Sequence, residues 1–199
     1  MLFRSPVNVP WEQAGALFVA GTTAYAAVRA VSIKAGETLV VSGAAGGVGS
    51  LSVQLATSMG AKVIGLASEG NHAWLRAHGV VPVSYGPGVA ARIREVSPKV
   101  DAFVDTFGGG YVELAIELGV APQRIDTIID FEAAAKHPGV KTAGSHEAAS
   151  AQVLGELAAL MATGRLEVPI AKTYPLARVQ DAYRELERRH SRGKIVLIP

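Results

Sequence analysis

The chain has 199 residues and no cysteine, and its 19 Lys and Arg against 17 Asp and Glu give a formal net charge of +2. Hydrophobic residues make up 49% of it and charged residues 18%, which excludes an intrinsically disordered protein and indicates about one globular domain. The lack of cysteine excludes disulfides and thiolate zinc sites within this chain. Lys and Arg are scattered along the sequence, so we expect no nucleic-acid partner.

No segment of the sequence is suited to crossing a membrane. The longest stretch of low polarity, residues 14–31, is interrupted by Gly21, Thr22, Thr23 and Arg29 and lacks the roughly 18 uninterrupted apolar residues of a spanning helix. Pro6 and Pro10 stand where a signal peptide would have its apolar core. The sequence therefore predicts a soluble protein with no membrane partner and a cytoplasmic location.

Helical patterns alternate with short apolar runs along most of the chain. A helical pattern over 11–32 comes first, and strands are predicted at 38–42, 61–67, 80–84, 100–106 and 124–129, with a candidate sixth at 140–142. Helices are predicted between them at 47–59, 71–78 (capped by Asn71), 89–96 and 111–118. Strands separated in this way pair in parallel through right-handed crossovers. The predicted fold class is α/β, a Rossmann-type doubly wound parallel sheet with helices on both faces.

The pattern changes beyond residue 145. A longer helix is predicted at 146–163, a short strand at 170–173, an amphipathic helix over 176–186 and a closing strand at 194–198. We therefore divide the chain into a helical segment that leads into the domain (1–32), a dinucleotide-binding Rossmann core (33–145) and a C-terminal part (146–199) that completes the cofactor domain.

The most informative motif is the glycine turn, residues 42–49 (SGAAGGVG), between the first predicted strand and the helix after it. A strand that turns tightly into a helix leaves backbone N–H groups unpaired at the positive end of the helix dipole, and small residues let a pyrophosphate approach them. Residues 44–49 fit the dinucleotide fingerprint with Ala in place of its first Gly. A glycine-rich turn without a ligand is the alternative, but the further strand–helix units favour dinucleotide binding.

The end of the second predicted strand bears on the choice between NADP and NAD. An NAD site usually has Asp or Glu there to hold the ribose hydroxyls, whereas this strand ends in Ala67-Ser68 and the first carboxylate is Glu69. An uncharged pocket with Asn71 and His72 nearby favours a 2′-phosphate, which a carboxylate would repel. NADP(H) is therefore predicted over NAD(H), although the same residues would suit a solvated loop and helix start.

Short-chain dehydrogenases also have a turn of this kind, but their chemistry needs a Tyr followed by a Lys four residues later. No Tyr in this chain meets that requirement, because the position four residues on holds Arg29, Val89, Ala115, Arg178 or Glu187. The sequence therefore argues against that class.

Four segments, in order, resemble the medium-chain dehydrogenases and reductases, and within them the zinc-independent quinone oxidoreductases. The segments are 12–28 (EQAGALFVAGTTAYAAV), 34–49, 100–110 (VDAFVDTFGGG) and 174–199. The resemblance covers nearly the whole chain. It implies an NADPH-dependent oxidoreductase that transfers hydride to a quinone, an enone or a similar small electrophilic acceptor, without catalytic zinc.

The resemblance also implies which residues bind the cofactor. Gly46, Gly47 and Val48 would meet the pyrophosphate, and Ser68 and Tyr85 would meet the adenosine 2′-phosphate. We add to these cofactor-binding candidates Ala45 in the turn and Asn71 and His72 from the uncharged pocket. Thr23 would lie near the nicotinamide, and the cleft after the fourth strand would be lined by Thr106, Phe107 and Gly108. The alternatives are a capping Thr23, a Tyr85 at the edge of the core and an ordinary turn at 108–110.

This sequence departs from the branch it resembles at two places. His72 stands where the branch usually has Lys, and because an imidazole gains charge below about pH 6.5 we expect tighter NADPH binding at lower pH. The fifth predicted strand ends in Ile128-Ile129-Asp130, where the family commonly turns through Gly. We interpret Asp130 as a local helix cap rather than a substrate-facing group. His78, His137, His146 and His190 are interpreted as solvated surface residues.

Family members carry a GroES-like catalytic domain before the segment matched by 11–31. We therefore expect this chain to be the cofactor-binding portion of the enzyme, inactive by itself, with catalytic residues unassigned. A non-catalytic NADP(H)-sensing module is the alternative. The C-terminal apolar side chains, including Leu186, Ile195 and Leu197, would pack on that domain, so we expect them to be exposed here or covered in a homodimer.

Overall fold

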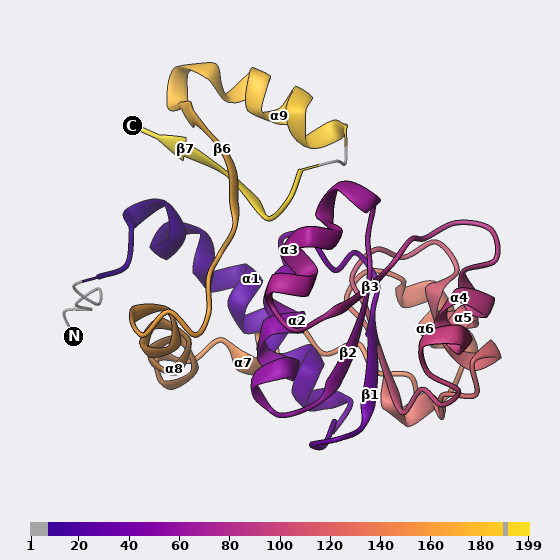
Figure 1. Cartoon of the computed structure of the whole chain (residues 1–199). Coiled ribbons are helices and arrows are strands. Elements are labelled where there is room, and N and C mark those ends of the chain that lie inside the picture. The colour runs from indigo at the N-terminus through magenta and orange to yellow at the C-terminus, as the bar shows by residue number, and fades with distance from the viewer. Residues whose placement is uncertain (1–7, 189–190) are drawn as a thin grey trace.

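The computed structural model describes residues 8–188 and 191–199, which form a five-stranded parallel sheet and a smaller strand pair (Figure 1). The five strands lie in the order β3-β2-β1-β4-β5. Their bounds are Thr38–Val41 (β1), Lys62–Leu66 (β2), Val81–Val83 (β3), Ala102–Asp105 (β4) and Ile125–Thr127 (β5). The order reverses between β1 and β4, where Leu39 pairs with Val63 on one side and with Ala102 on the other. This order is that of a doubly wound sheet.

Helices cover both faces of this sheet, which confirms the predicted fold class. One face carries α1 (Trp11–Ala30), α2 (Gly49–Ser58) and α3 (His72–Ala77, preceded by the 3-10 turn Glu69–Asn71), and the other carries α4 (Val89–Val96) and α5 (Tyr111–Glu117) (Figure 1). Strand β1 alternates between the two layers, because Leu39 and Val41 pack with the first set of helices and Val40 with the second. All four β1 residues are buried, as expected for a parallel sheet covered on both sides.

A third apolar layer lies outside α1 and α2. Helix α8 (Ala151–Ala162) packs Leu157 against Leu17 of α1 and Leu51 of α2. The single helix predicted at 146–163 is wrong: the chain forms α7 (Ser145–Ala148) and then α8. The break occurs because the Ser150 side chain accepts a hydrogen bond from Val153 N (3.1 Å) and so caps a new helix.

The C-terminal unit stands apart from the main sheet (Figure 1). It comprises β6 (Ile170–Pro175), the 3-10 turn Leu176–Arg178, α9 (Val179–Glu187) and β7 (Lys194–Ile198), with β6 and β7 parallel to each other. Its apolar side chains are only partly covered, since Leu186 is 53% and Leu197 37% exposed, while Ile195 is half-buried. The exposure expected for Leu186 and Leu197 is therefore confirmed in the single chain.

Two other elements differ from the sequence prediction. The candidate strand at 140–142 is reduced to one isolated bridge, in which Lys141 pairs in parallel with Asp126 of β5. A short helix that was not predicted, α6 (Phe131–Lys136), follows β5. Asp130 caps α6 by accepting a hydrogen bond from Ala133 N (3.1 Å), which confirms its interpretation as a cap.

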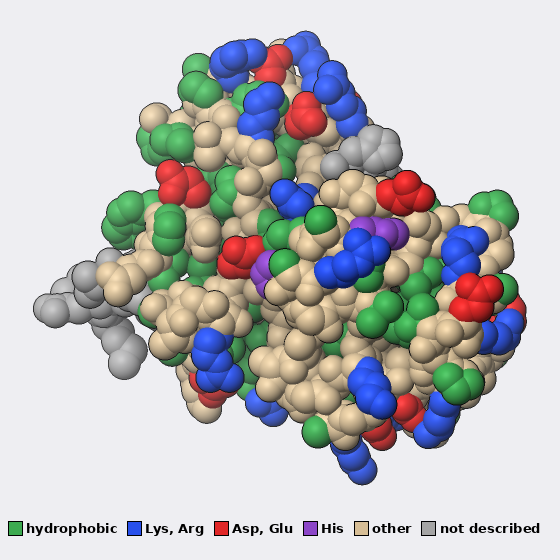
Figure 2. Space-filling model, viewed as in Figure 1, with side chains coloured by type: hydrophobic (Ala, Val, Ile, Leu, Met, Phe, Trp, Pro, Cys, Tyr) green, Lys and Arg blue, Asp and Glu red, His purple; other side chains and the backbone are tan. Residues whose placement is uncertain are grey.

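Charges of both signs are interspersed on the face drawn in Figure 2, including the part over the C-terminal unit. Within residues 8–188 and 191–199, the structure has no helix with both the length and the apolar character that a bilayer crossing requires.

Candidate functional site

One buried carboxylate joins the ends of the three strands nearest the reversal of strand order. Asp105, the last residue of β4, accepts hydrogen bonds at Oδ1 from Ser42 Oγ (2.6 Å), Phe107 N (3.0 Å) and Gly108 N (2.9 Å). Its Oδ2 accepts from Thr127 Oγ1 of β5 (2.8 Å). Asp105 is fully buried, and all these partners lie at the carboxyl ends of β1, β4 and β5. Ligands of doubly wound folds bind in the crevice at this edge.

The loop after β4 lies against the glycine turn. Thr106 N donates to Ser42 Oγ (2.9 Å), and Thr106 Oγ1 donates to Ser42 O (2.7 Å). Gly43 has φ +56°, and an ideal Cβ at that position would be 2.8 Å from Thr106 Oγ1. The structure therefore brings together the glycine turn and the residues Thr106, Phe107 and Gly108, as the predicted site requires.

Different neighbours limit the space for a side chain at each glycine of the turn. A Cβ on Gly49 would be 2.2 Å from Gly43 O, so this position needs glycine for the close approach of α2 to the end of β1. A Cβ on Gly46 would be 3.1 Å from the same oxygen, which is tight but not prohibitive. Among the described residues, the N–H groups of Ala45 and Val48 have no hydrogen-bond acceptor. Unpaired donors in front of α2 are the arrangement that an anion such as a pyrophosphate needs.

The C-terminal unit crosses the same turn, which the sequence did not reveal. Gly46 and Gly193 form an isolated parallel bridge, and Gly193 N donates to Ala45 O (2.8 Å). The side chain of Lys194 lies over Gly47, where an ideal Cβ would be 2.8 Å from Lys194 Cδ. A side chain at position 47 would therefore require the Lys194 side chain to shift. In the sequence, only the Arg192-Gly193-Lys194 tripeptide could have indicated this contact with the glycine turn.

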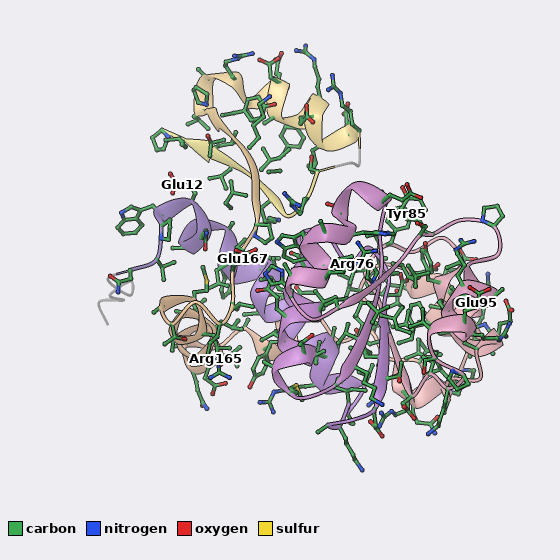
Figure 3. The ribbon with its side chains drawn as sticks, in the orientation of Figure 1. Glu12, Arg76, Tyr85, Glu95, Arg165 and Glu167 are labelled. Atoms are coloured by element: carbon green, nitrogen blue, oxygen red, sulfur yellow. The ribbon has the colours of Figure 1, made fainter. Side chains whose placement is uncertain are left out.

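The residues expected near the adenosine lie at the ends of β2 and β3. Asn71 Nδ2 donates to Ser68 Oγ (3.0 Å), and His72 Nε2 is 3.3 Å from Ala67 O. The predicted helix cap by Asn71 is wrong, because its side chain bonds Ser68 and makes no cap hydrogen bond to α3. Tyr85, in the loop after β3, is 49% exposed. Figure 3 marks Tyr85 and, on the neighbouring helix α3, Arg76.

Arg92 of α4 holds the loop that carries Tyr85, a role that the sequence analysis missed. Its Nε and Nη2 donate to Ser84 O (3.0 and 2.9 Å), and Nη1 donates to Pro87 O (2.8 Å). The guanidinium therefore fixes the main chain on both sides of Tyr85, with no contact to a carboxylate among these bonds.

Tyr111 of α5 lies against Phe107 of the loop after β4. Its ring lies 6.0 Å from that of Phe107 in an edge-on arrangement, measured between centroids. Burial raises the pKa of Tyr111, and the nearby Asp105 and Tyr85 raise it further. The phenol is thus neutral at ordinary pH and available as a hydrogen-bond donor.

Thr23 lies in the middle of α1, so the alternative of a capping residue is wrong. It is buried, and its Oγ1 donates to Val19 O (2.6 Å) within the helix. No contact of Thr23 with the glycine turn is among the hydrogen bonds of the described residues, and its proximity to the nicotinamide stays a prediction.

Asp126 of β5 is a second buried carboxyl group, after Asp105 of β4. Its Oδ1 accepts a hydrogen bond from Ala143 N (2.7 Å), whereas Oδ2 has no partner among the described residues. Burial raises the pKa of Asp126 to about 7, and the bond from Ala143 N only partly offsets this. The group therefore changes charge near neutral pH.

A hollow of about 500 Å³ lies away from this edge, between α2, the end of α3 and the connection from α8 to β6. Glu167 (labelled in Figure 3) lines it and has its Oε1 2.8 Å from Trp74 Nε1 and 3.3 Å from His78 Nε2. The interpretation of His78 as a solvated surface residue is wrong, since its side chain is 24% exposed and paired with Glu167. His190 lies outside the described residues.

The family model described as zinc-binding dehydrogenase matches residues 75–197. The chain belongs to the zinc-binding dehydrogenase family. The matched region includes Asp105 and the loop after β4 together with Gly193 and Lys194, and it begins after the glycine turn. The resemblance to the medium-chain dehydrogenases and reductases, with their quinone oxidoreductases, is thereby confirmed.

Several named proteins match this chain over almost its whole length. Polyketide synthase GfsB of Streptomyces halstedii is 32% identical over 210 residues, or 98% of this chain and 4% of the synthase. A quinone oxidoreductase of Pseudomonas aeruginosa is 29% identical over 223 residues, or 100% of this chain and 68% of the relative. The structure of the quinone oxidoreductase from Coxiella burnetii matches with a TM-score of 0.83 and 28% identity, covering 98% of this chain and 63% of the other. The chain thus spans only part of each relative.

The name of the zinc-binding dehydrogenase family raises the question of a metal. In the part of the chain that the structure describes, no three His, Cys, Asp or Glu side chains are grouped so that they could hold a metal ion. The described residues therefore do not fit a zinc site.

Proposed function

We propose that the chain binds a nicotinamide dinucleotide at the carboxyl edge of its sheet and serves hydride transfer in an NADPH-dependent oxidoreductase. The observation that carries this is the junction of the glycine turn with the loop held by Asp105, at the reversal of strand order. The bound dinucleotide would supply the hydride, and a quinone, an enone or a similar electrophile would accept it. The protein residues position the cofactor and shape the site.

The proposed contacts follow the geometry of the edge. The N–H groups of Ala45 and Val48 would donate to the pyrophosphate, with Gly46 and Gly47 leaving room for it. Thr106, Phe107 and Gly108 would line the nicotinamide side, because Asp105 holds their main chain against the turn.

We propose NADP(H) over NAD(H) because no carboxylate ends β2. Ser68, the half-buried hydroxyl after this strand, is bonded by Asn71 and neighboured by His72, and Tyr85 follows the adjacent strand. These hydroxyl, amide and imidazole groups can donate to a 2′-phosphate, while the nearby Glu69 is exposed.

Titration of the 199-residue chain with NADPH and NADH by calorimetry tests the proposal. We expect saturable binding of both, with the tighter dissociation constant for NADPH. Gly46→Asp, which places a negative charge in the turn, should bind neither. A wild-type chain that binds neither dinucleotide would overturn the proposal, and equal affinity for both would overturn the preference for NADP(H).

The relatives are named as oxidoreductases and synthases, which favours the enzyme over the NADP(H)-sensing module. NADPH oxidation by the full-length protein with a quinone and with an enone distinguishes the two, because a sensor would bind the dinucleotide without turnover of either acceptor.

We also propose that the exposed Leu186 and Leu197 are covered by a second copy of the chain. Light scattering should then give twice the mass of one chain, 20.6 kDa. A single-chain mass at micromolar concentration would contradict this.

A further inference from the structure

The guanidinium of Arg92, on α4, is directed at the main chain of the loop after β3. Its Nε and Nη2 donate to Ser84 O (3.0 and 2.9 Å), and its Nη1 donates to Pro87 O (2.8 Å). Nη2 also donates to Tyr85 O and Gly86 O (3.3 Å each). Four successive carbonyl groups thus accept hydrogen bonds from one side chain. A planar guanidinium with five N–H donors can do this, whereas the three donors of a lysine ammonium radiate from one atom.

The main chain of this loop has little other support. Gly86 has φ +98° and Gly88 has φ +77°, conformations that glycine adopts easily and leaves as easily. Among the described residues, the four carbonyl groups accept only one main-chain hydrogen bond, from Val89 N to Gly86 O (3.1 Å). The other three carbonyl groups have Arg92 as their donor. The shape of the loop therefore depends on the guanidinium.

The loop begins beside the residue expected to bind the 2′-phosphate. Strands β2 and β3 pair in parallel, and Ala67 N donates to Val83 O (3.1 Å), so the chain after β3 starts next to Ser68. Tyr85, labelled in Figure 3, is 49% exposed while its carbonyl group faces Arg92. The position of the phenol relative to Ser68 is therefore set by a loop that Arg92 holds.

Arg92 is not engaged by a carboxylate. Within residues 8–188 and 191–199, none of the salt bridges involves it, although its side chain is half-buried. Arg94, two positions later on the same helix, instead bonds Glu117 O (3.0 Å) and pairs with the carboxylate of Glu117. The polar contacts of Arg92 are thus all made to the loop that carries Tyr85.

We propose that Arg92 is a positioning residue that determines the preference for NADPH over NADH. This role rests on the proposed function, in which Ser68 and Tyr85 bind the 2′-phosphate. Arg92 acts through Tyr85, because it orders the loop and holds the phenol hydroxyl where it can donate to this phosphate. The entropy of the loop is then lost on folding and not on binding, which favours the dinucleotide that uses the loop. NADH has no 2′-phosphate and gains nothing from this order.

The test compares calorimetric titrations of the 199-residue chain with NADPH and with NADH. Arg92→Met removes the bonds to the loop and should weaken NADPH binding by about tenfold, the usual effect of one lost hydrogen bond to a charged group. NADH binding should change by less than about twofold. Arg92→Lys keeps the charge without the planar arrangement of donors, so it should lose nearly as much NADPH affinity. Arg94→Met is the matched control, because it removes an arginine of the same helix that contacts Glu117 and not the loop.

A double-mutant cycle with Tyr85→Phe tests whether Arg92 acts through the phenol. If both residues serve one contact, Arg92→Met should lower NADPH affinity by less than about twofold in the Tyr85→Phe background. Hydrogen exchange of the unliganded chain is a readout that needs no dinucleotide. The amides of Tyr85 and Gly86 should exchange faster in Arg92→Met than in wild type, while those of α2 should not.

Wild-type NADPH affinity in Arg92→Lys would overturn the inference in favour of the charge alone. Equal losses for NADPH and NADH would overturn it in favour of a general effect on the fold, and so would a loss in Arg94→Met as large as that in Arg92→Met. Additive losses in the cycle would overturn the route through Tyr85. If Arg92→Met does not fold, Arg92→Lys takes its place in every comparison. If wild type binds neither dinucleotide, the proposed function fails and this inference with it, whereas changes in the variants alone leave the proposed function standing.

Discussion

Asp105 accepts a 2.6 Å hydrogen bond from the hydroxyl of Ser42, a residue 63 positions earlier in the chain. The same hydroxyl accepts a bond from Thr106 N, so this side chain joins the ends of β1 and β4 in addition to the main-chain bond from Ser42 N to Val104 O. Phe107 N and Gly108 N bond to the same carboxylate oxygen. One buried carboxylate therefore sets the position of the loop that faces the glycine turn.

Removal of this carboxylate should destabilise the fold. Asp105→Ala leaves two hydroxyls and two N–H groups without their acceptor, and we expect a loss of about 3 kcal/mol or more in the free energy of unfolding. Ser42→Ala should lose about 1–2 kcal/mol. Urea denaturation measures both. Asp181→Ala is the control, because it removes a partly exposed carboxylate of α9 that is paired with Arg178 and Arg184. An effect as small in Asp105→Ala would contradict the role assigned to Asp105.

Two glycines of the turn should respond differently to substitution. Gly49→Ala places a Cβ 2.2 Å from Gly43 O, so α2 must move, and we expect a loss of about 3 kcal/mol or more in stability. Gly46→Asp meets the same oxygen at 3.1 Å, and should fold but lose dinucleotide binding. Thermal melting and titration separate the two effects. If Gly46→Asp fails to fold, or if Gly49→Ala is as stable as wild type, the space assigned to these two positions beside Gly43 O is wrong.

His72 should limit the discrimination between NADPH and NADH. A permanent positive charge at this position would pair with a 2′-phosphate, which NADH lacks. His72→Lys should therefore improve NADPH binding by about tenfold and leave NADH binding nearly unchanged. Calorimetric titration measures both affinities, and an unchanged NADPH affinity in His72→Lys would take position 72 out of the site.

Asp126 should make stability depend on pH near neutrality. Burial raises its pKa to about 7, above the ordinary value of an unfolded chain, so the folded state keeps this proton longer than the unfolded state. Its contribution to stability is complete below about pH 4 and is lost as the pH rises through about 7, with a decline of about 2 kcal/mol between pH 5 and pH 7.

Asp126→Asn should flatten this decline and be the more stable protein at pH 8. Melting temperatures at pH 5, 7 and 8 test it. Asp101→Asn is a useful contrast, because the bond from Lys99 and the bond from Thr38 N lower the pKa of Asp101. Its contribution is therefore present above about pH 4 and lost in acid. Identical pH profiles for wild type and Asp126→Asn would contradict the burial argument.

The sequence predicted the main sheet well because parallel strands buried on both faces have continuous apolar runs, as at 38–42 for β1. Helix α4 coincides with its predicted range, 89–96. The sequence did not predict the interruption between α7 and α8 at 149–150. The spacing of apolar residues continues across these positions, and only the Ser150 side chain marks the break. The short helix α6 was missed because one and a half turns hold too few apolar positions to show a period.

The candidate site was predictable where it is contiguous in sequence. The glycine turn is such a segment, and its placement between β1 and α2 is confirmed. Asp105, Arg92 and Lys194 could not be assigned from sequence, because their roles depend on contacts that only the folded chain creates. Asn71 shows the same limit of sequence-based prediction. Asn is a common helix cap, but here its side chain donates a hydrogen bond to Ser68 Oγ instead of capping α3.

Gly193 bears on any exchange of the C-terminal unit in protein engineering. Its closest neighbour, Pro169, directly precedes this unit, and its bond across to the Rossmann core ends on the main-chain oxygen of Ala45. A chimera that takes residues 169–199 from a relative therefore carries the tight Pro169–Gly193 contact inside the transplanted piece. What must be remade at the junction is the hydrogen bond between the two peptide groups and the packing of Lys194 on Gly47 and of Ile170 on the third apolar layer.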